Sequence, residues 1–360
     1  MTNKFLLFIL SCVFIALNFI GCSSSEYVNR KDKTVYDSGL SPYYEIPTAL
    51  TDSSKIADII SDYSKFLKGK KIIIDPGHGG ADRKNSNRDG SVIEADINLD
   101  VALYLKSFLI DAEAEVLMTR SSDQTVSLDD RSKIANSSSA DLFLSIHHNT
   151  TSDKMDYRTN YTSTFYHARE NDYDYEPYEH QIAKYIQRDL AYAMRNSGGL
   201  ASFDGTISDY LIYEGDGFAV LRNTKIPAVL IECSFITNRF EEKRLGIKEF
   251  NEIQAWGIFN GLAKFFKNKI PSINLIQDKC EYTKDQLKLF VTVDDPFPLN
   301  VKSINVWYNK SEIDFDVNPI DKNIEIYVQN PIEGEYELKV VYADKRGFYA
   351  KPFNRKILIK

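Results

Sequence analysis

The alternation of short apolar runs with helical stripes between residues 70 and 268 constrains the fold of this chain more than any other feature. The runs at 71–75, 141–147 and 226–233 are almost continuously apolar, which is typical of parallel strands buried on both faces. Between them, apolar residues recur every three or four positions, as in the stripe at 97–108. The pattern predicts an α/β domain with a mostly parallel sheet flanked by helices on both faces.

The hydrophobic period changes from helical to two after Pro271. Apolar and polar residues alternate in four stretches, at 287–293, 304–308, 324–328 and 336–340. Turn signals such as "DDPFP" and "VNPIDKN" separate these stretches. We therefore expect a small all-β domain, sandwich-like, over 275–360.

The first residues predict export. Lys4 precedes an apolar run over 5–20, which is short for a membrane span and fits the core of a signal peptide. "FIGC" at 19–22 resembles the box of bacterial lipoproteins, in which the signal is cut before a cysteine that becomes lipidated, here Cys22. An ordinary secretory peptide and a signal anchor are the alternatives.

Three N-terminal segments follow from this interpretation. Residues 1–22 are the expected lipoprotein signal peptide, 23–50 a flexible tether, and 51–268 the α/β domain. We expect a protein exported and lipid-anchored to the cell envelope, facing the periplasm from the outer membrane in an organism that has one. The membrane would then be a partner through lipidated Cys22.

Charge and cysteine content exclude some classes of protein. The formal net charge is −7 and the basic residues do not cluster, so a nucleic-acid partner is not expected. Cys233 and Cys280 fall in different predicted domains, which favours free, buried thiols over a disulfide. Cys233 beside His147 would suit a nucleophile, but its apolar run favours a place in the core.

Polar residues follow the predicted strands where each strand ends. They are His78 after the first strand, His147 and His148 after the third, and Glu232 near the end of the last, with Glu94 at the start of the first long helix. Ligands of open α/β sheets bind at the carboxyl ends of strands. Two imidazoles and one carboxylate form the three-ligand set of a catalytic zinc site, with a fourth position left for water.

Alternative roles stay open for several of these residues. Strand alternation places His147 and His148 on opposite faces, so only one of them is expected to face the site. Glu94 is also the kind of residue that the dipole favours at a helix N-terminus. His167 and His180 lie in or near a polar stretch, and we expect them at the surface.

Several longer motifs occur in order over residues 70–268. They read "IIIDPGHGGAD", "IEADINLDVALYLKSFL", "VLMTRSSDQTVSLDDRSKIAN", "ADLFLSIHHN" and "AVLRNTKIPAVLIECSFITN". Together they resemble the zinc-dependent N-acetylmuramoyl-L-alanine amidases (amidase type 3) of bacterial cell walls. The resemblance implies a catalytic domain at 51–268 that binds one zinc ion and hydrolyses the bond between N-acetylmuramic acid and L-alanine in peptidoglycan.

The resemblance also implies residue roles. His78, Glu94 and His147 would bind the zinc, which resolves the choice between His147 and His148. Glu232 would be the catalytic glutamate, taking a proton from the attacking water and passing it to the departing amine. Two departures remove no ligand: His148 stands in place of a small residue, and Ser234 in place of a glycine.

Three questions stay open at this point. The long segment 151–180 is either an inhibitory lid, displaced by an activator protein as in some relatives, or a plain surface loop. The same metal chemistry would serve a zinc peptidase that cuts within the stem peptide. A binding lipoprotein without activity is the third alternative, although it would need none of the four site residues.

Overall fold

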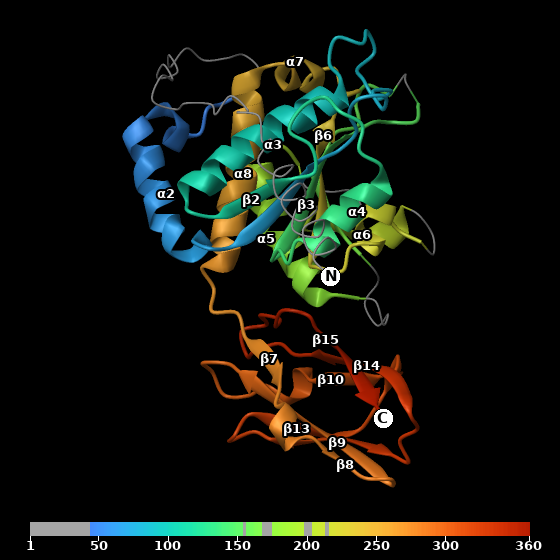
Figure 1. Ribbon diagram of the computed structural model, residues 1–360. Coiled ribbons are helices and arrows are strands. Elements are labelled where there is room, and N and C mark those ends of the chain that lie inside the picture. Colours follow the sequence, from blue (N-terminus) through green and yellow to red (C-terminus); the bar gives the residue numbers. More distant parts are fainter. Residues whose placement is uncertain (1–43, 154–155, 168–174, 198–203, 213–215) are drawn as a thin grey trace, which may run out of the picture. The chain divides into compact units, whose positions relative to one another are not determined.

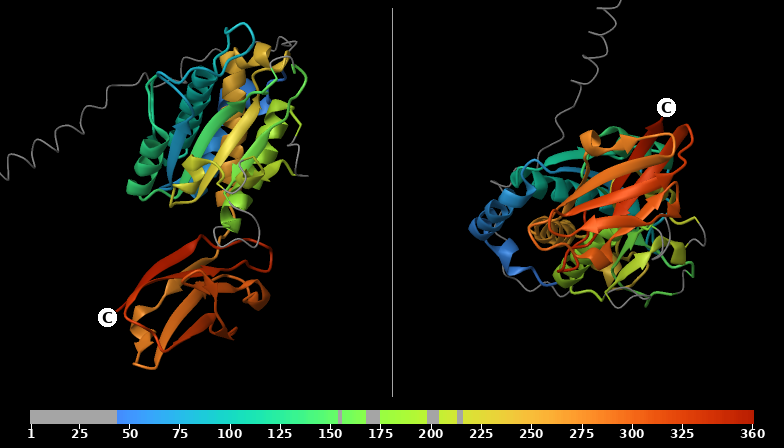
Figure 2. Two further views of the ribbon diagram at one scale, coloured as in Figure 1. Left: turned by 90° about the vertical axis from the view of Figure 1, so that its right-hand side faces the viewer. Right: turned by 90° about the horizontal axis from the view of Figure 1, so that it is seen from below.

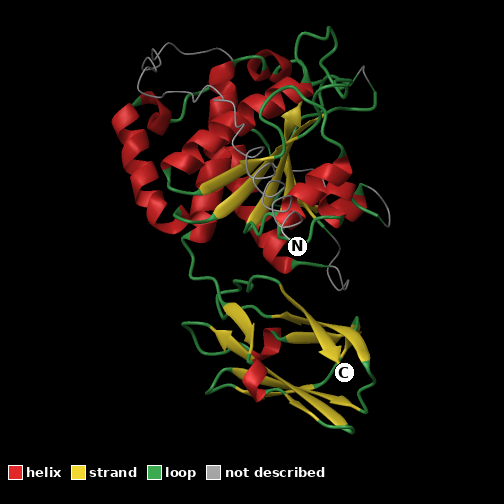
Figure 3. Ribbon diagram, viewed as in Figure 1, coloured by secondary structure: helices red, strands yellow, loops and turns green. Residues whose placement is uncertain are grey.

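The computed structural model describes residues 44–153, 156–167, 175–197, 204–212 and 216–360. The expected signal peptide, Cys22 and most of the expected tether lie outside the described residues, as does the centre of the long 151–180 segment. Two regions follow one another along the described chain, the first built of helices and strands and the second almost entirely of strands (Figure 3).

The strands of the first region form one six-stranded sheet in the order β2-β1-β3-β6-β4-β5. Their bounds are β1 Lys71–Pro76, β2 Glu115–Met118, β3 Leu142–Asn149, β4 Ser163–Tyr166, β5 Thr206–Ser208 and β6 Ala228–Phe235. β2, β1, β3 and β6 are mutually parallel, whereas β4 runs antiparallel to β6 and parallel to β5. The predicted mostly parallel sheet is confirmed.

Helices cover both faces of this sheet (Figures 1 and 2). Their bounds are η2 Thr48–Thr51, α2 Ser53–Leu67, α3 Glu94–Asp111, α4 Leu128–Ser137, α5 Pro177–Met194, η3 Asp209–Leu211, α6 Ala219–Arg222, α7 Glu241–Leu245 and α8 Lys248–Phe266. Successive residues of β1 serve the two faces: Ile72 and Ile74 belong to the core under the long helices, and Ile73 to a separate core under α4 and α6. This double coverage explains the near-continuous apolar strands.

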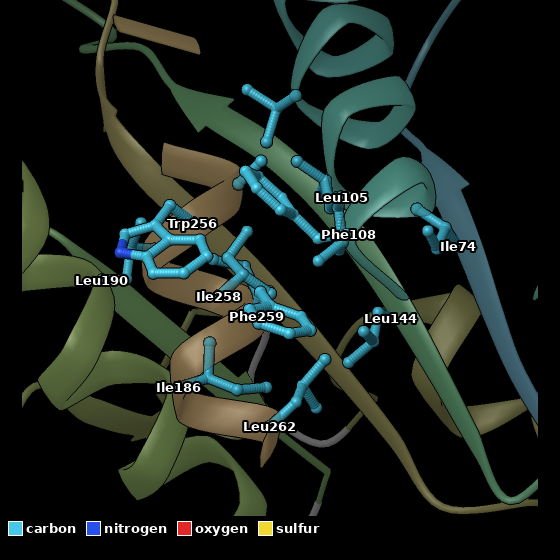
Figure 4. Packing of buried hydrophobic residues seen from close by; sticks show 14 of the residues in the cluster. Ile74, Leu105, Phe108, Leu144, Ile186, Leu190, Trp256, Ile258, Phe259 and Leu262 are labelled. Atoms are coloured by element: carbon cyan, nitrogen blue, oxygen red, sulfur yellow. The ribbon is translucent and has the colours of Figure 1, made fainter. Parts of the chain in front are cut away.

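The larger core lies between the sheet and helices α3, α5 and α8 (Figure 4). Phe108 of α3 stacks on Phe259 of α8 with 5.5 Å between ring centroids. α8 also approaches α5 closely, because a Cβ on Gly261 would lie 2.6 Å from the Cα of Ile186. Tight packing of this kind holds the α3 N-terminus against the ends of β1 and β3, where the candidate site residues lie.

The second region consists of two antiparallel sheets with a shared apolar core. One has the order β11-β10-β14-β15, and the other β12-β13-β9-β7 with β8 paired to β9. Bounds are β7 Ser272–Leu275, η4 Gln277–Lys279, β8 Glu281–Tyr282, β9 Gln286–Asp294, η5 Val301–Ser303, β10 Asn305–Tyr308, β11 Ser311–Glu312, β12 Phe315–Asn318, β13 Asn323–Gln329, β14 Gly334–Val341 and β15 Phe353–Ile359. The predicted all-β region is confirmed.

The cysteines and the helix lengths complete the description. Cys233 and Cys280 are both free, and Cys233 is buried as expected. Cys280 is only half-buried, contrary to expectation, because it follows η4 at the margin of a sheet and not on a core-facing strand position. Within the part of the chain that the structure describes, no helix combines the length and apolar character needed to cross a bilayer.

Candidate metal centre and catalytic carboxylate

His78, Glu94 and His147 converge at the carboxyl ends of β1 and β3. Nε2 of His78 lies 3.2 Å from Oε2 of Glu94, and Nδ1 of His147 lies 3.0 Å from Oε1 of the same carboxylate. One ligand atom from each residue lies within 4.8 Å of the others. Among the described residues these are the His, Cys, Asp and Glu side chains that could hold a metal ion as a group of three.

The glycine before His78 makes room for the second imidazole. A Cβ on Gly77 would lie 2.2 Å from Cε1 and 2.3 Å from Nε2 of His147. His78 itself adopts φ = 59°, a left-handed conformation that is uncommon for a non-glycine residue and costs about 1–3 kcal/mol. The turn at the end of β1 therefore brings two imidazoles together in two ways: Gly77 leaves room for the His147 ring, and His78 adopts a left-handed backbone conformation.

Two buried arginines hold this turn in place. Arg120 donates from Nε to the Pro76 carbonyl and from Nη2 to the Gly77 carbonyl, at 2.9 and 2.8 Å. Arg131 donates to the Pro76 and His78 carbonyls and forms an ion pair with Asp75 at 2.6 Å. Since unpaired buried carbonyls are costly, these contacts stabilise the strained turn.

Polar groups around the ligands orient them. Nδ1 of His78 lies 2.7 Å from a carboxylate oxygen of Asp82, so the ring presents Nε2 to the site. Asn85 donates from Nδ2 to Oε2 of Glu94 at 2.7 Å. Contacts of this kind fix the tautomer and orientation of metal-binding side chains.

His148 lies behind the site and does not face it. Its side chain is buried, with Nδ1 and Nε2 each 2.8 Å from a side-chain amide oxygen, of Asn98 on α3 and Gln254 on α8. Burial lowers its pKa to about 4, against the opposing effect of the hydrogen bond with Gln254. Its backbone N–H and the Asn98 amide both donate to Oε1 of Glu94, at 3.1 and 3.3 Å. The orientation implied by the resemblance, with His147 toward the site, is the one the structure has.

Glu232 lies beside the three ligands on the neighbouring strand. It pairs in register with His147 across β3 and β6, so the two side chains leave the sheet on the same face. Its Oε2 is buried and has no hydrogen-bond partner among the described residues. Burial, assisted by the charge of Glu94, raises the pKa of Glu232 well above its usual value.

The charges of the site fit a bound cation. Burial opposes a charge on His78, but its bonds to Glu94 and Asp82 outweigh burial and raise its pKa to about 9. Burial likewise disfavours the Glu94 carboxylate, and the bonds to His147 and His78 lower its pKa well below the usual range. The Glu94 carboxylate is thus kept ionised by positive charge beside it. A zinc ion bound by the two imidazoles and this carboxylate would supply such a charge.

The remaining sequence-predicted residues lie elsewhere. His167 and His180 are partly buried and not on the surface as expected: Nδ1 of His167 lies 2.9 Å from the buried carboxylate of Asp209, and His180 stacks on Tyr166 at 4.2 Å. The sequence around both histidines is polar, so it gave no indication that they would contact the buried residues Asp209 and Tyr166. Cys233 contributes to the core, and its pKa is raised by burial, which argues against a thiolate nucleophile.

Sequence reasoning missed the supporting residues of the site. Asp82, Asn85 and Asn98 contact the ligands, and Arg120 and Arg131 hold the turn. Asn98 carried a usable signal, since it lies four positions after Glu94 on one helix face. Asp82 and Asn85 lie in an irregular loop whose contacts no periodic pattern indicates, and the two arginines contact carbonyl groups more than 40 positions away.

His78, His147 and Glu232 lie at the carboxyl ends of strands of an α/β sheet and Glu94 at the N-terminus of α3, an arrangement of the kind that hydrolases use to bind a metal ion. The family described as N-acetylmuramoyl-L-alanine amidase matches residues 72–264, and the chain belongs to this family. The match spans β1 through almost the whole of α8.

Individual proteins of known name are similar to parts of this chain. The germination-specific N-acetylmuramoyl-L-alanine amidase of Bacillus subtilis is 29% identical over 223 residues, covering 58% of this chain and 84% of the relative. The probable cell wall amidase LytH of Staphylococcus epidermidis is 31% identical over 206 residues, covering 57% of this chain and 61% of the relative. Among solved structures, the CwlD amidase of Clostridioides difficile in complex with the GerS lipoprotein is 28% identical, covers 55% of this chain and 99% of that chain, and gives a TM-score of 0.47.

Proposed function

We propose that this protein is a zinc-dependent peptidoglycan amidase, which hydrolyses the amide bond between N-acetylmuramic acid and L-alanine. The observation that carries the proposal is Oε2 of Glu232, buried and without a hydrogen-bond partner in the described part of the chain, beside the converging side chains of His78, Glu94 and His147. Family membership supports the bond that is cut. The work of such an enzyme is remodelling or degradation of the cell wall.

His78, Glu94 and His147 would hold one zinc ion, which supplies a polarised amide carbonyl and a water of lowered pKa. Glu232 accepts the proton of the attacking water at its carboxylate. It then donates that proton to the nitrogen of L-alanine as the carbon–nitrogen bond breaks. Asp82, through Nδ1 of His78, and the Asn98–His148 pair, through Oε1 of Glu94, keep the ligands oriented.

Export and lipidation complete the proposal. The signal peptide, the lipobox with Cys22 and a tether reaching to about residue 50 would place the enzyme on the envelope within reach of peptidoglycan, its substrate. An activator protein is a further proposed partner, and the long 151–180 segment is either the point at which it acts or a plain surface loop. The sequence supports no nucleic-acid partner.

A defined muramoyl peptide tests the proposal. Wild-type protein should release peptide with a new N-terminal alanine amine, lose this activity on chelation, and regain it on addition of zinc. Glu232→Gln should retain zinc and lose activity by about 100-fold or more, the usual contribution of a general acid–base group. Zinc-loaded protein that binds the substrate without hydrolysing it would favour the binding-protein alternative and contradict the proposal.

A further inference from the structure

An exposed cluster of arginines and aromatic rings lies at the same end of the sheet as the metal centre. Its members are Tyr157 and Arg158, on the loop after β3, and Arg239 and Phe240, just after the turn that follows β6. Tyr157 and Phe240 are 41% and 62% exposed, although both are large apolar side chains. We refer to these four residues as the arginine–tyrosine cluster.

The cluster is built by contacts across the two loops. The Arg158 guanidinium lies 5.6 Å from the centre of the Tyr157 ring, and the Arg239 guanidinium 5.9 Å from the same ring and 5.0 Å from that of Phe240. The Arg239 N–H donates to the Tyr157 carbonyl at 3.2 Å. Such contacts orient the guanidinium groups while leaving their N–H groups free to bind a ligand.

Hydrogen bonds join the loop after β3 to the turn after β6 along their length, beginning at the strands that carry His147 and Glu232. Ile236 N–H donates to the Asn149 carbonyl at 2.9 Å, two residues beyond His147 and four beyond Glu232. Farther out, the side-chain amide of Asn238 donates to the Arg158 carbonyl at 3.0 Å. Figure 1 shows β6 ending at the side of the sheet where α7 begins, directly after the cluster. Arg239 lies seven positions after Glu232 along the chain. The two are therefore joined by at most about 25 Å of extended chain, and by less through a turn, a distance comparable to a peptide of several residues.

Neither arginine of the cluster is held by a close acidic side chain. No ion pair of Arg158 or Arg239 is found among the described residues, although the charge of Arg158 helps to lower the pKa of Asp156. The acidic side chain nearest in sequence, Asp156, accepts hydrogen bonds from the backbone N–H groups of Arg158 and Thr159 and from the Thr159 hydroxyl. Two exposed arginines outside the ion pairs of the described residues are notable on a chain of net charge −7. Guanidinium groups favour carboxylates through paired hydrogen bonds.

We propose that the arginine–tyrosine cluster binds the carboxylates of the stem peptide beyond L-alanine, and so selects substrates with a free acidic peptide. The inference rests on the proposed amidase function, because that reaction places the stem peptide, from L-alanine onward, at the departing side of the bond. Arg158 and Arg239 would bind the carboxylates, and Tyr157 and Phe240 would supply the apolar contact beneath the peptide.

Paired substrates test this binding site. Steady-state kinetics would compare a muramoyl peptide with free carboxylates and the same peptide with its carboxylates amidated. For the first substrate, the double variant Arg158→Gln, Arg239→Gln should raise KM about tenfold, from the loss of hydrogen bonds to charged groups, with kcat within about twofold. Amidation should raise KM similarly in the wild type, and the double variant should add nothing further. Arg188→Gln is the matched control, since that arginine also lies over a tyrosine ring, 4.9 Å from the centre of Tyr185, on α5.

Two results would overturn the proposal: an unchanged KM in the double variant, or an equal rise for both substrates, which would mean a contact that does not involve carboxylates. Calorimetric binding of the free stem peptide to wild type and double variant provides a measurement without hydrolysis. If the wild type cuts neither substrate, the amidase proposal fails. In that case, weaker binding of the peptide by the double variant than by the wild type would still support the cluster as a carboxylate site. Equal binding by the two proteins would reject it.

Discussion

Gly77→Ala is the smallest change that should disable the metal centre. The new Cβ would lie 2.2, 2.3 and 2.6 Å from Cε1, Nε2 and Nδ1 of His147. Ordinary contacts between such atoms are about 3.5 Å, so the ring must move by roughly 1 Å. Metal–ligand distances tolerate only about 0.2 Å, so His147 would no longer bind the ion together with Glu94 and His78.

The size of the effect follows from the loss of a ligand. Loss of an outer-shell contact alone weakens metal binding about 10- to 100-fold, so zinc affinity should fall by more than about 100-fold, or roughly 2.7 kcal/mol. Overpacking adds a loss of stability of about 1–3 kcal/mol. Gly77 does not have a positive φ, so alanine adds no backbone strain.

Competition with a chromophoric chelator measures the zinc affinity, with circular dichroism to verify folding. Gly246→Ala is the control, because its Cβ would lie an ordinary 3.5 Å from Val92, and it should bind zinc as the wild type does. A folded Gly77→Ala protein with zinc affinity within about threefold of wild type would refute the reasoning, since His147 would then not be a ligand.

Further predictions concern the carboxylates, the supporting histidine and the anchor. Because the pKa of Glu232 is raised in the folded state, that state binds more protons than the unfolded chain above pH 4.5, and stability falls as pH rises. Metal-free Glu232→Gln should therefore be more stable than wild type at pH 8 in urea unfolding, with the difference vanishing near pH 4; a difference that does not change with pH would contradict this. Asp82→Asn should weaken zinc binding about tenfold by chelator competition, and unchanged affinity would exclude its orienting role. His148→Ala, which leaves Asn98 and Gln254 without their partner, should lower zinc affinity about 10- to 100-fold, whereas a variant that is merely less stable would argue for packing alone. Cys22→Ala should release the protein from membranes on fractionation, and retention would refute lipid anchoring.

The sequence predicted the sheet, and it singled out side chains that the structure brings together, because both depend on short-range patterns. Each of His78, His147 and Glu232 lies at or near the end of an apolar run, and parallel strands bring such ends to one edge. The same patterns could not show the buried arginines, because a charged residue in a polar segment has the pattern of a surface residue. Only the fold shows that Arg120 is buried, with its guanidinium bonded to the Pro76 and Gly77 carbonyls at the end of β1.

Errors arose where polar sequence is buried by contacts distant along the chain. His167 was expected at the surface, but Asp209, 42 residues later, lies against it within the fold. The short helices α6 and α7 have four and five residues, too few for a hydrophobic period to emerge. The choice between His147 and His148 needed the family resemblance, since alternation alone could not say which face carried the site.

Mass spectrometry of products from purified peptidoglycan sacculi, treated with the full-length protein, tests the central claim most directly. We predict free stem peptides that begin with an unblocked L-alanine, absent after chelation and absent with Glu232→Gln. Shortened peptides that remain attached to the muramic acid would contradict the account, because they would show cleavage within the stem by a zinc peptidase.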